Sequence, residues 1–369
     1  MSITAEDNLF PPGEFIRDEL DARNWTQEDL AAILNRPLPT VNQIILAKKR
    51  ITSQTAQELA AAFGTSAELW LNLEASYRLA SERQSQAPVA RRAKLYELGP
   101  VKDMLKRRWI EKCDTIDALE TEVCAFFEIN SVNEDPRIAA AARKSTDYTE
   151  STPAQRAWLF RAKKLAQACT AAKYSKEAME KRLEQLHALT ASEQEVRRVP
   201  EVLAQMGIRF VVVEHLPRTK LDGAAFWLSS DSPVIVLSLR YDRIDWFWHT
   251  LIHELRHIFH RDGTRIDNDL VSSPRTTKEK EMRADREASD FLIPHEVLDS
   301  FIARVKPRFS KQRIIKFANL HSIHPGIVVG QLQYQGAIKY SHSREMLVGV
   351  RNIITEAALT DGWGVSAGI

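Results

Sequence analysis

The stretch IDWFWHTLIHELRHIFHRDG, residues 244–263, decides the fold and chemistry expected for the second half of the chain. Its apolar residues recur at helical spacing, and no glycine or proline interrupts it before Gly263. On such a helix His253 and His257 lie one turn apart on the same face, so both imidazoles can bind one ion. Glu254 stands where a carboxylate reaches a water beside the metal without binding the metal itself. The stretch therefore predicts an H-E-x-x-H zinc site.

A catalytic zinc site of this kind has three protein ligands, so a third must come from another segment. The stretch KEKEMRADREASDFLIP (278–294) predicts a second helix that packs against the first. We expect an acid on this helix to complete the site. Small alanines on one of its faces would allow close approach of the two helices. That face carries Glu281, Ala284, Asp285, Ala288 and Phe291.

Three short β-branched or aromatic runs precede the metal helix and predict strands. They are IRFVVVEHL (208–216), DGAAFWL (222–228) and PVIVLSL (233–239). Residues 93–200 have an almost wholly helical pattern, and residues 296–358 are helical with a turn at 324–326. SERQSQAPVARR (81–92) is polar, small and proline-containing, which is typical of a linker.

Near the N-terminus, TQEDLAAILNRPLPTVNQIIL (26–46) fits a helix-turn-helix. Thr26 is placed to cap a first helix, and residues 35–37 break it. A second helix begins near Pro39, whose missing N–H costs nothing in a first turn. Apolar residues would bury its inner side and leave Leu38, Thr40, Asn42 and Gln43 facing outward. The inner residues are Val41, Ile44 and Ile45.

Amide and hydroxyl side chains on the outer face of that second helix can reach base edges in the major groove. The basic residues that follow can contact phosphates. With a net charge of only +2, any DNA binding must come from such a local patch. The alternative is a helical protein-binding module with a solvated charge run. The predicted DNA-contacting residues are Gln27, Arg36, Leu38, Thr40, Asn42, Gln43, Lys48 and Lys49, with Arg50 beside them.

Residues 11–80 resemble the HigA family of antitoxins, within the Cro and phage-repressor group. The resemblance lies in the PGE opening, the TQEDLA helix, the KKRIT turn and the closing FGTSAELWLNL. It implies a homodimeric, operator-binding domain, often autoregulatory and often partnered with a ribonuclease toxin of the HigB kind. Leu38, between two prolines, replaces the more usual polar residues at the start of the recognition helix, so the operator sequence does not carry over.

Residues 190–335 resemble the ImmA/IrrE family of metallo-endopeptidases, through HELRH (253–257) and EMRADREASDFLIP (281–294). Counting back from the closing FLIP, the resemblance places the family's leading glutamate at Glu281, as the third zinc ligand. Glu287 is the rival, although it falls where the family usually has an aromatic residue. On a helix it also points about 120° away from Glu281.

Two further side chains are expected to support the zinc site without binding the ion. Asp285, one turn beyond Glu281, is placed to hold a ligand imidazole. His249 lies one turn before His253 and is expected to be a supporting or core histidine.

The fold expected from these patterns is mainly α with a smaller α+β part. Residues 1–82 form a five-helix, lambda-repressor-like helix-turn-helix domain, and residues 83–195 a linker and helical middle region. Residues 196–340 form a zincin-like domain with a small β-sheet and the H-E-x-x-H helix. Residues 341–369 form a C-terminal tail.

The expected function is that of a DNA-binding transcription regulator with a zinc-dependent endopeptidase domain, which cleaves a repressor or partner protein. Zn²⁺ would be held by His253, His257 and Glu281, and Glu254 would transfer the proton. The alternative is an antitoxin-like, autoregulating repressor whose C-terminal domain binds a metal or a partner without significant proteolysis.

The chain is expected to work in the cytoplasm. Its three cysteines are too far apart for a C-x-x-C pair and suit a reducing compartment. The N-terminus lacks the features of a signal peptide, and no apolar run approaches the roughly 20 residues that span a bilayer. No membrane partner is expected.

Overall fold

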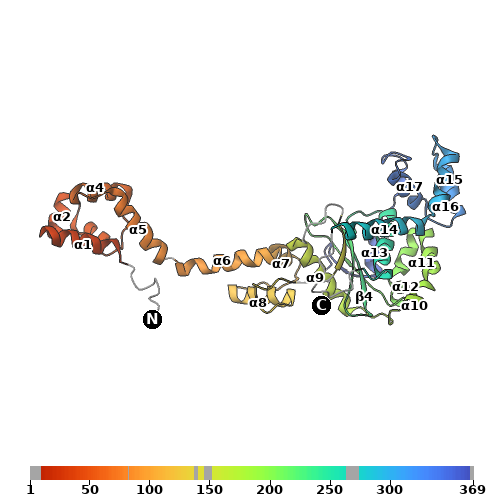
Figure 1. Ribbon diagram of the computed structural model, residues 1–369, viewed down its shortest axis with the longest axis horizontal. Helices are drawn as coiled ribbons and strands as arrows, with labels where there is room; N and C mark the ends of the chain where they lie inside the picture. The colour runs from red at the N-terminus through yellow and green to blue at the C-terminus, as the bar shows by residue number, and fades with distance from the viewer. Residues whose placement is uncertain (1–9, 82, 137–139, 145–151, 263–273, 366–369) are drawn as a thin grey trace. The chain divides into compact units, whose positions relative to one another are not determined.

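The computed structural model describes residues 10–81, 83–136, 140–144, 152–262 and 274–365. The chain forms two compact units, residues 1–93 and 94–369. Figure 1 shows their helices and strands, some of them labelled.

The first unit contains the five helices that the sequence predicts between residues 10 and 81. Thr26 caps the second of them, because its Oγ1 accepts a hydrogen bond from the Asp29 backbone N–H while the Asp29 carboxylate accepts one from Thr26. Trp70 is fully buried at the centre of the unit. The helices are α1 (Pro12–Arg23), α2 (Gln27–Ile33), α3 (Leu38–Ile45), α4 (Ser53–Phe63) and α5 (Ala67–Ser81).

The linker predicted over residues 81–92 is replaced by a helix, α6 (Arg83–Leu98). Pro88 lies inside this helix. A proline there removes one backbone N–H and crowds the carbonyl four residues earlier, whereas the surrounding arginine, glutamine and alanine residues favour helix formation. The division between the two units falls within α6, after Ala93.

Helices make up most of the second unit, in agreement with the predicted patterns at 93–200 and 296–358. Between residues 101 and 205 lie α7 (Val101–Lys106), α8 (Ile116–Phe127), α9 (Pro153–Ala168), α10 (Lys176–Glu180), α11 (Leu183–Ala188), η1 (Leu189–Ala191), η2 (Glu193–Arg198) and α12 (Val199–Gln205). Between residues 244 and 357 lie α13 (Ile244–Phe259), α14 (Pro274–Leu292), α15 (His295–Val305), α16 (Lys311–Leu320), α17 (Pro325–Tyr334), η3 (Arg344–Met346) and α18 (Arg351–Ala357).

Within the described residues, one five-stranded mixed sheet forms in the order β1-β3-β4-β2-β5. β2 (Arg209–Val213), β3 (Leu221–Trp227) and β4 (Pro233–Leu237) confirm the three predicted strands. β1 (Ala140–Lys144) and β5 (Leu359–Asp361) were not predicted. β1 and β4 each pair antiparallel with β3, whereas β2 pairs parallel with both β4 and β5.

Helices cover both faces of this sheet. Along β2, Phe210 and Val212 join the apolar core shared with α12 and α13, while Val211 and Val213 join the core shared with α8 and α9. In Figure 1, α9 and α13 accordingly lie on opposite sides of the strands. Because side chains on both faces are buried, the central strands are continuous apolar runs without polar alternation.

The predicted middle region and tail belong to the same packed unit as the sheet, so the structure divides the chain differently from the expected boundaries at 195 and 340. From α9, the Trp158 indole N–H donates to the Val213 carbonyl over 2.9 Å. Arg161, also on α9, donates from Nε to the Asp361 carboxylate on β5 over 2.7 Å. Both partners of this ion pair are buried.

Replacing Arg161 by alanine should destabilise the second unit by about 3–5 kcal/mol, because Asp361 would remain buried without its charged partner. Urea unfolding of the full chain, followed by tryptophan fluorescence, measures the change. Lys163→Ala is the matched control on the same helix, because its pair with Glu128 is partly exposed and should contribute less than about 1 kcal/mol. Equal losses for the two variants would contradict the structural role of the buried pair.

Candidate metal centre and DNA-binding surface

Helix α13 lies close against β3 at Gly223. A Cβ on Gly223 would stand 2.9 Å from Thr250 Cγ2 and 3.1 Å from Glu254 Cγ, so a larger residue would force these side chains to shift. The polar residues on this side of α13 are therefore enclosed. His253 and Glu254 are fully buried, and His257 is 1% exposed.

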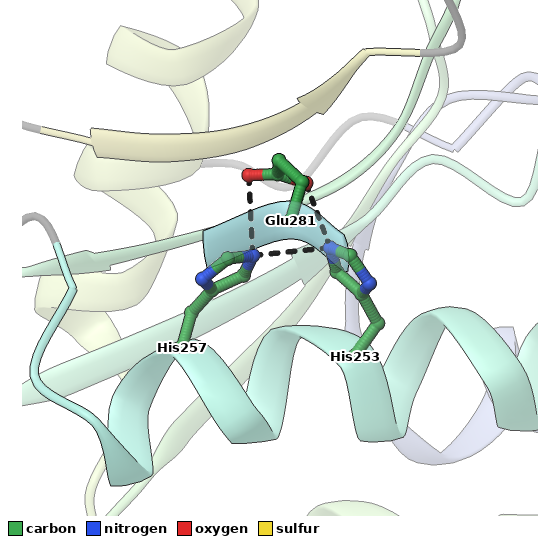
Figure 2. A group of neighbouring side chains, drawn as sticks. All are labelled: His253, His257 and Glu281. Atoms are coloured by element: carbon green, nitrogen blue, oxygen red, sulfur yellow. Dashed lines mark hydrogen bonds and ion pairs between the residues drawn. The ribbon is translucent and has the colours of Figure 1, made fainter. Parts of the chain in front are cut away.

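His253, His257 and Glu281 come together as the sequence analysis predicts. Figure 2 shows both imidazoles rising from α13 toward the Glu281 carboxylate on α14. The two Nε2 atoms are 3.0 Å apart, and Glu281 Oε2 lies 3.1 Å from His253 Nε2. Glu281 Oε1 lies 3.4 Å from His257 Nε2. Among the described residues, this is the group of side chains whose ligand atoms could hold a metal ion.

Helix α14 approaches α13 through the predicted alanine face, since Ala284 and Ala288 are both buried. The approach brings Glu281, and not Glu287, to the histidines. Glu287 instead contacts His260 Nε2 at 2.9 Å and lies 3.8 Å from Arg256 Nε, away from the candidate ligands.

Each candidate ligand imidazole has a carboxylate against its second nitrogen. His253 Nδ1 lies 2.9 Å from Asp285 Oδ1, where the sequence analysis places that aspartate. His257 Nδ1 lies 3.1 Å from Asp262 Oδ2. A carboxylate that accepts the Nδ1 proton fixes the tautomer and leaves the Nε2 lone pair for an ion. Both Nε2 atoms point toward Glu281, where each could bind a metal once its proton is lost.

Asp262, which the sequence analysis missed, is placed by the C-terminal turn of α13. Arg261 adopts a left-handed conformation with φ 55°, and its N–H donates to the Ile258 carbonyl. The Asp262 N–H donates to the His257 carbonyl over 2.9 Å, which completes a Schellman motif. This turn returns the Asp262 side chain to the imidazole of the same His257. The available signal was an acid five residues after the second histidine of the motif.

Two basic residues of α14 also contact the Asp262 carboxylate. Arg283 donates from Nη2 to Asp262 Oδ2 over 2.7 Å, and Lys280 Nζ lies 3.6 Å from Oδ1. Arg283 and Lys280 flank Glu281 in sequence. The helix that supplies the third candidate ligand is therefore also tied to the residue that orients His257.

The candidate site attracts positive charge. Burial lowers the pKa of His257, but hydrogen bonds to Asp262 and Glu281 and the nearby charge of Glu254 outweigh it and raise the pKa to about 10. Burial raises the pKa of Glu281, but hydrogen bonds to both histidines outweigh that effect and lower the pKa to about 2. When no metal is bound, His257 is therefore protonated at neutral pH, and a metal must displace that proton.

The donor set fits zinc. Two imidazole nitrogens and one carboxylate are a ligand set of catalytic zinc sites, and the carboxylates behind both imidazoles match the usual support of such ligands. Glu254, between the histidines on α13, lies close enough to affect the pKa of His257. His249 lies one turn away, with its Nε2 3.3 Å from Ser289 Oγ.

The predicted DNA-contacting residues of the first unit lie on or beside α3. Lys48 and Lys49 are exposed directly after this helix, and Gln27 is half-buried at the first position of α2. Gln43 is exposed, whereas Thr40 and Asn42 are half-buried at the sides of α3.

Leu38 differs from the outward position expected for it, and Arg36 also contacts another helix of the unit. Leu38 does not face outward but is half-buried against the core of the unit, because its position on α3 lies close to the inner face. Arg36 lies 2.7 Å from Glu58 on α4, so its guanidinium joins two helices of the unit.

Comparison with known proteins agrees with this first unit. The helix-turn-helix family profile matches residues 16–70. Virulence-associated protein I from Dichelobacter nodosus is 33% identical over 93 residues, which are 24% of this chain and 86% of that protein. The uncharacterised HTH-type transcriptional regulator YddM of Escherichia coli (strain K12) is 29% identical over 84 residues, 23% of this chain and 88% of that protein.

Among solved structures, Pseudomonas aeruginosa antitoxin HigA with the higBA promoter is 34% identical, with a TM-score of 0.21, and the match covers 22% of this chain and 88% of that one. The fold of the first unit and the match to residues 16–70 define a helix-turn-helix domain of the DNA-binding regulator type. Through this domain the chain belongs to the helix-turn-helix family. In the described part of the chain, no helix has both the length and the apolar character needed to cross a membrane.

The geometry of the candidate metal centre predicts one zinc ion per chain. Zinc titration followed by calorimetry should give this stoichiometry for the wild type, whereas His253→Ala and Glu281→Gln should lose it. Glu287→Gln is the matched control and should bind as the wild type does. Because His257 gives up a proton on binding, affinity should fall as the pH is lowered from 8 to 6. Loss of binding in the Glu287 variant alone would assign the third ligand to Glu287.

Proposed function

We propose that this protein is a DNA-binding transcription regulator that carries a zinc-dependent endopeptidase in its second unit. The observation that carries the endopeptidase is the cluster of the buried His253 and His257 with the half-buried Glu281, and Glu254 between the two histidines. A site that only bound a metal for structural reasons would not need Glu254. The ImmA/IrrE and zincin-like assignments of this unit stay predictions.

In this proposal, His253, His257 and Glu281 hold the zinc ion. Bound zinc would supply a Lewis acid that polarises the scissile carbonyl and makes a water molecule more acidic. Glu254 would accept a proton from the water as its oxygen bonds to the carbonyl carbon. It would then deliver that proton to the amide nitrogen, so that the C–N bond breaks and the amine leaves. Asp262 and Asp285 would keep both imidazoles oriented throughout.

The regulatory half of the proposal is supported by the first unit alone. Its helix-turn-helix domain presents α3, followed by Lys48 and Lys49, which suits an operator duplex with α3 in the major groove. The protein cleaved would be a repressor or another partner. A homodimer and a toxin partner of the HigB kind stay predictions.

Glu254→Gln should separate metal binding from catalysis. The variant should keep stoichiometric zinc and lose cleavage, because glutamine has nearly the same shape but cannot take up the proton. Cleavage is measured by mass spectrometry on a mixed library of short synthetic peptides. Glu287→Gln should cleave as the wild type does.

The outcome also decides between the two candidate functions. If zinc-loaded wild type cuts no peptide and no protein encoded beside its gene, the endopeptidase is ruled out. The protein would then be an antitoxin-like repressor whose second unit binds a metal or a partner. Equal cleavage by wild type and Glu254→Gln would instead remove Glu254 from the mechanism.

Asp262→Asn should weaken zinc binding by about 10–100-fold, because the amide carries no charge to support the imidazole behind the metal. Competition with a chromophoric chelator measures the affinity. Arg261→Gly is the control at the same turn, since glycine suits its left-handed conformation and should leave zinc affinity unchanged. Unchanged affinity in Asp262→Asn would mean that Asp262 only closes the end of α13.

A further inference from the structure

The outward side of α3 carries more apolar residues than the sequence analysis predicted. The helix is buried through Val41, Ile44 and Ile45. At about 100° per residue, the direction opposite those three is occupied by positions 39, 43 and 46. Asn42 and Thr40 then lie at the two sides, about 100° from the buried direction.

Exposure of the side chains agrees with this geometry. Pro39 and Gln43 are exposed, and Leu46 is 54% exposed at the C-terminal end of α3. Asn42, by contrast, is half-buried, and its Oδ1 is enclosed without a hydrogen-bond partner among the described residues. The outermost stripe of α3 is therefore Pro39, Gln43 and Leu46, one amide between two apolar side chains.

We propose that this stripe reads adenine–thymine pairs in the operator, with Pro39 and Leu46 against thymine methyl groups and Gln43 on an adenine. The inference rests on the operator binding proposed above and adds the base chemistry that is recognised. Thymine is the base that presents a methyl group in the major groove, and apolar side chains make contact with it. A glutamine amide can bond both N6 and N7 of adenine.

The length of the stripe suits consecutive base pairs. From position 39 to position 46 the helix rises about 10 Å at 1.5 Å per residue. This distance corresponds to about three base-pair steps of 3.4 Å. One helix therefore presents Pro39, Gln43 and Leu46 to neighbouring pairs in a single major-groove segment.

The charges around the stripe favour DNA over a second copy of the chain. Lys48, Lys49 and Arg50 are all exposed directly after α3, in a chain whose net charge is only +2. Positive charge concentrated beside an exposed helix face suits a polyanion, whereas two identical basic faces would repel each other.

The test uses the full chain and two random-sequence duplex libraries, one made with thymidine and the other with deoxyuridine, which lacks the methyl group. Selection from the thymidine library should enrich sites with adjacent A·T pairs. Rebuilding a selected site with uracil should weaken binding about fourfold for each methyl group lost, the effect expected for one buried carbon.

Variants assign the effect to residues. For Leu46→Ala, the difference in affinity between the thymine and uracil forms of the site should be smaller than for the wild type. Gln43→Ala should no longer distinguish adenine from the other bases at its position. Lys49→Ala is the control and should weaken binding to all sequences alike. Analytical ultracentrifugation of Leu46→Ala checks that its oligomeric state is unchanged.

The possible failures are distinguishable. If the protein binds no duplex from either library, the proposed operator binding fails, and this inference fails with it. If it binds duplexes but uracil and thymine forms bind equally, only the methyl reading is overturned. A Leu46→Ala variant that changes oligomeric state while keeping the full thymine preference would assign the stripe to a protein contact instead.

Discussion

The arrangement of the second unit depends on the close approach of one helix, α13, to a strand and to a second helix. Gly223 admits α13 against β3, and Ala284 and Ala288 admit α14 on the adjoining side. Because these three residues have small side chains or none, the polar groups of α13 become enclosed between the sheet and α14. Burial is costly for histidine unless its ring nitrogens have partners, and His253 and His257 each face a carboxylate. The three candidate ligands meet where these layers converge.

The partners of the two histidines come from different kinds of local structure. Asp285 is carried by the regular face of α14, one turn from Glu281. Asp262 is carried by the turn that ends α13, where the left-handed Arg261 reverses the chain. Arg283 joins that turn to α14. The imidazoles are thus held by their own helix and by its neighbour, which limits how far either can rotate.

The first unit uses the same packing rules for another purpose. Val41, Ile44 and Ile45 bury one side of α3 and so determine which residues point straight outward. The outward residues are Pro39, Gln43 and Leu46, and not the wider polar set expected from composition. Leu38 shows the difference, because it lies about 60° from the centre of the buried face and packs against the core. The outward face of α3 therefore holds fewer residues than the set that the sequence predicted to face outward.

Local patterns in the sequence by themselves determined much of this protein. Helical spacing placed His253 and His257 on one face, apolar runs marked β2, β3 and β4, and Thr26 marked a helix start. Only the tertiary structure decided which carboxylates surround the histidines, and that β1 and β5 join the sheet. β5 pairs with β2, a strand nearly 150 positions earlier in the chain. Asp262 reaches His257 only because the turn after α13 reverses the chain. The spacing of apolar residues indicates which side of a helix or strand is buried. The β5 pairing and the Asp262 contact instead depend on how distant segments of the chain come together.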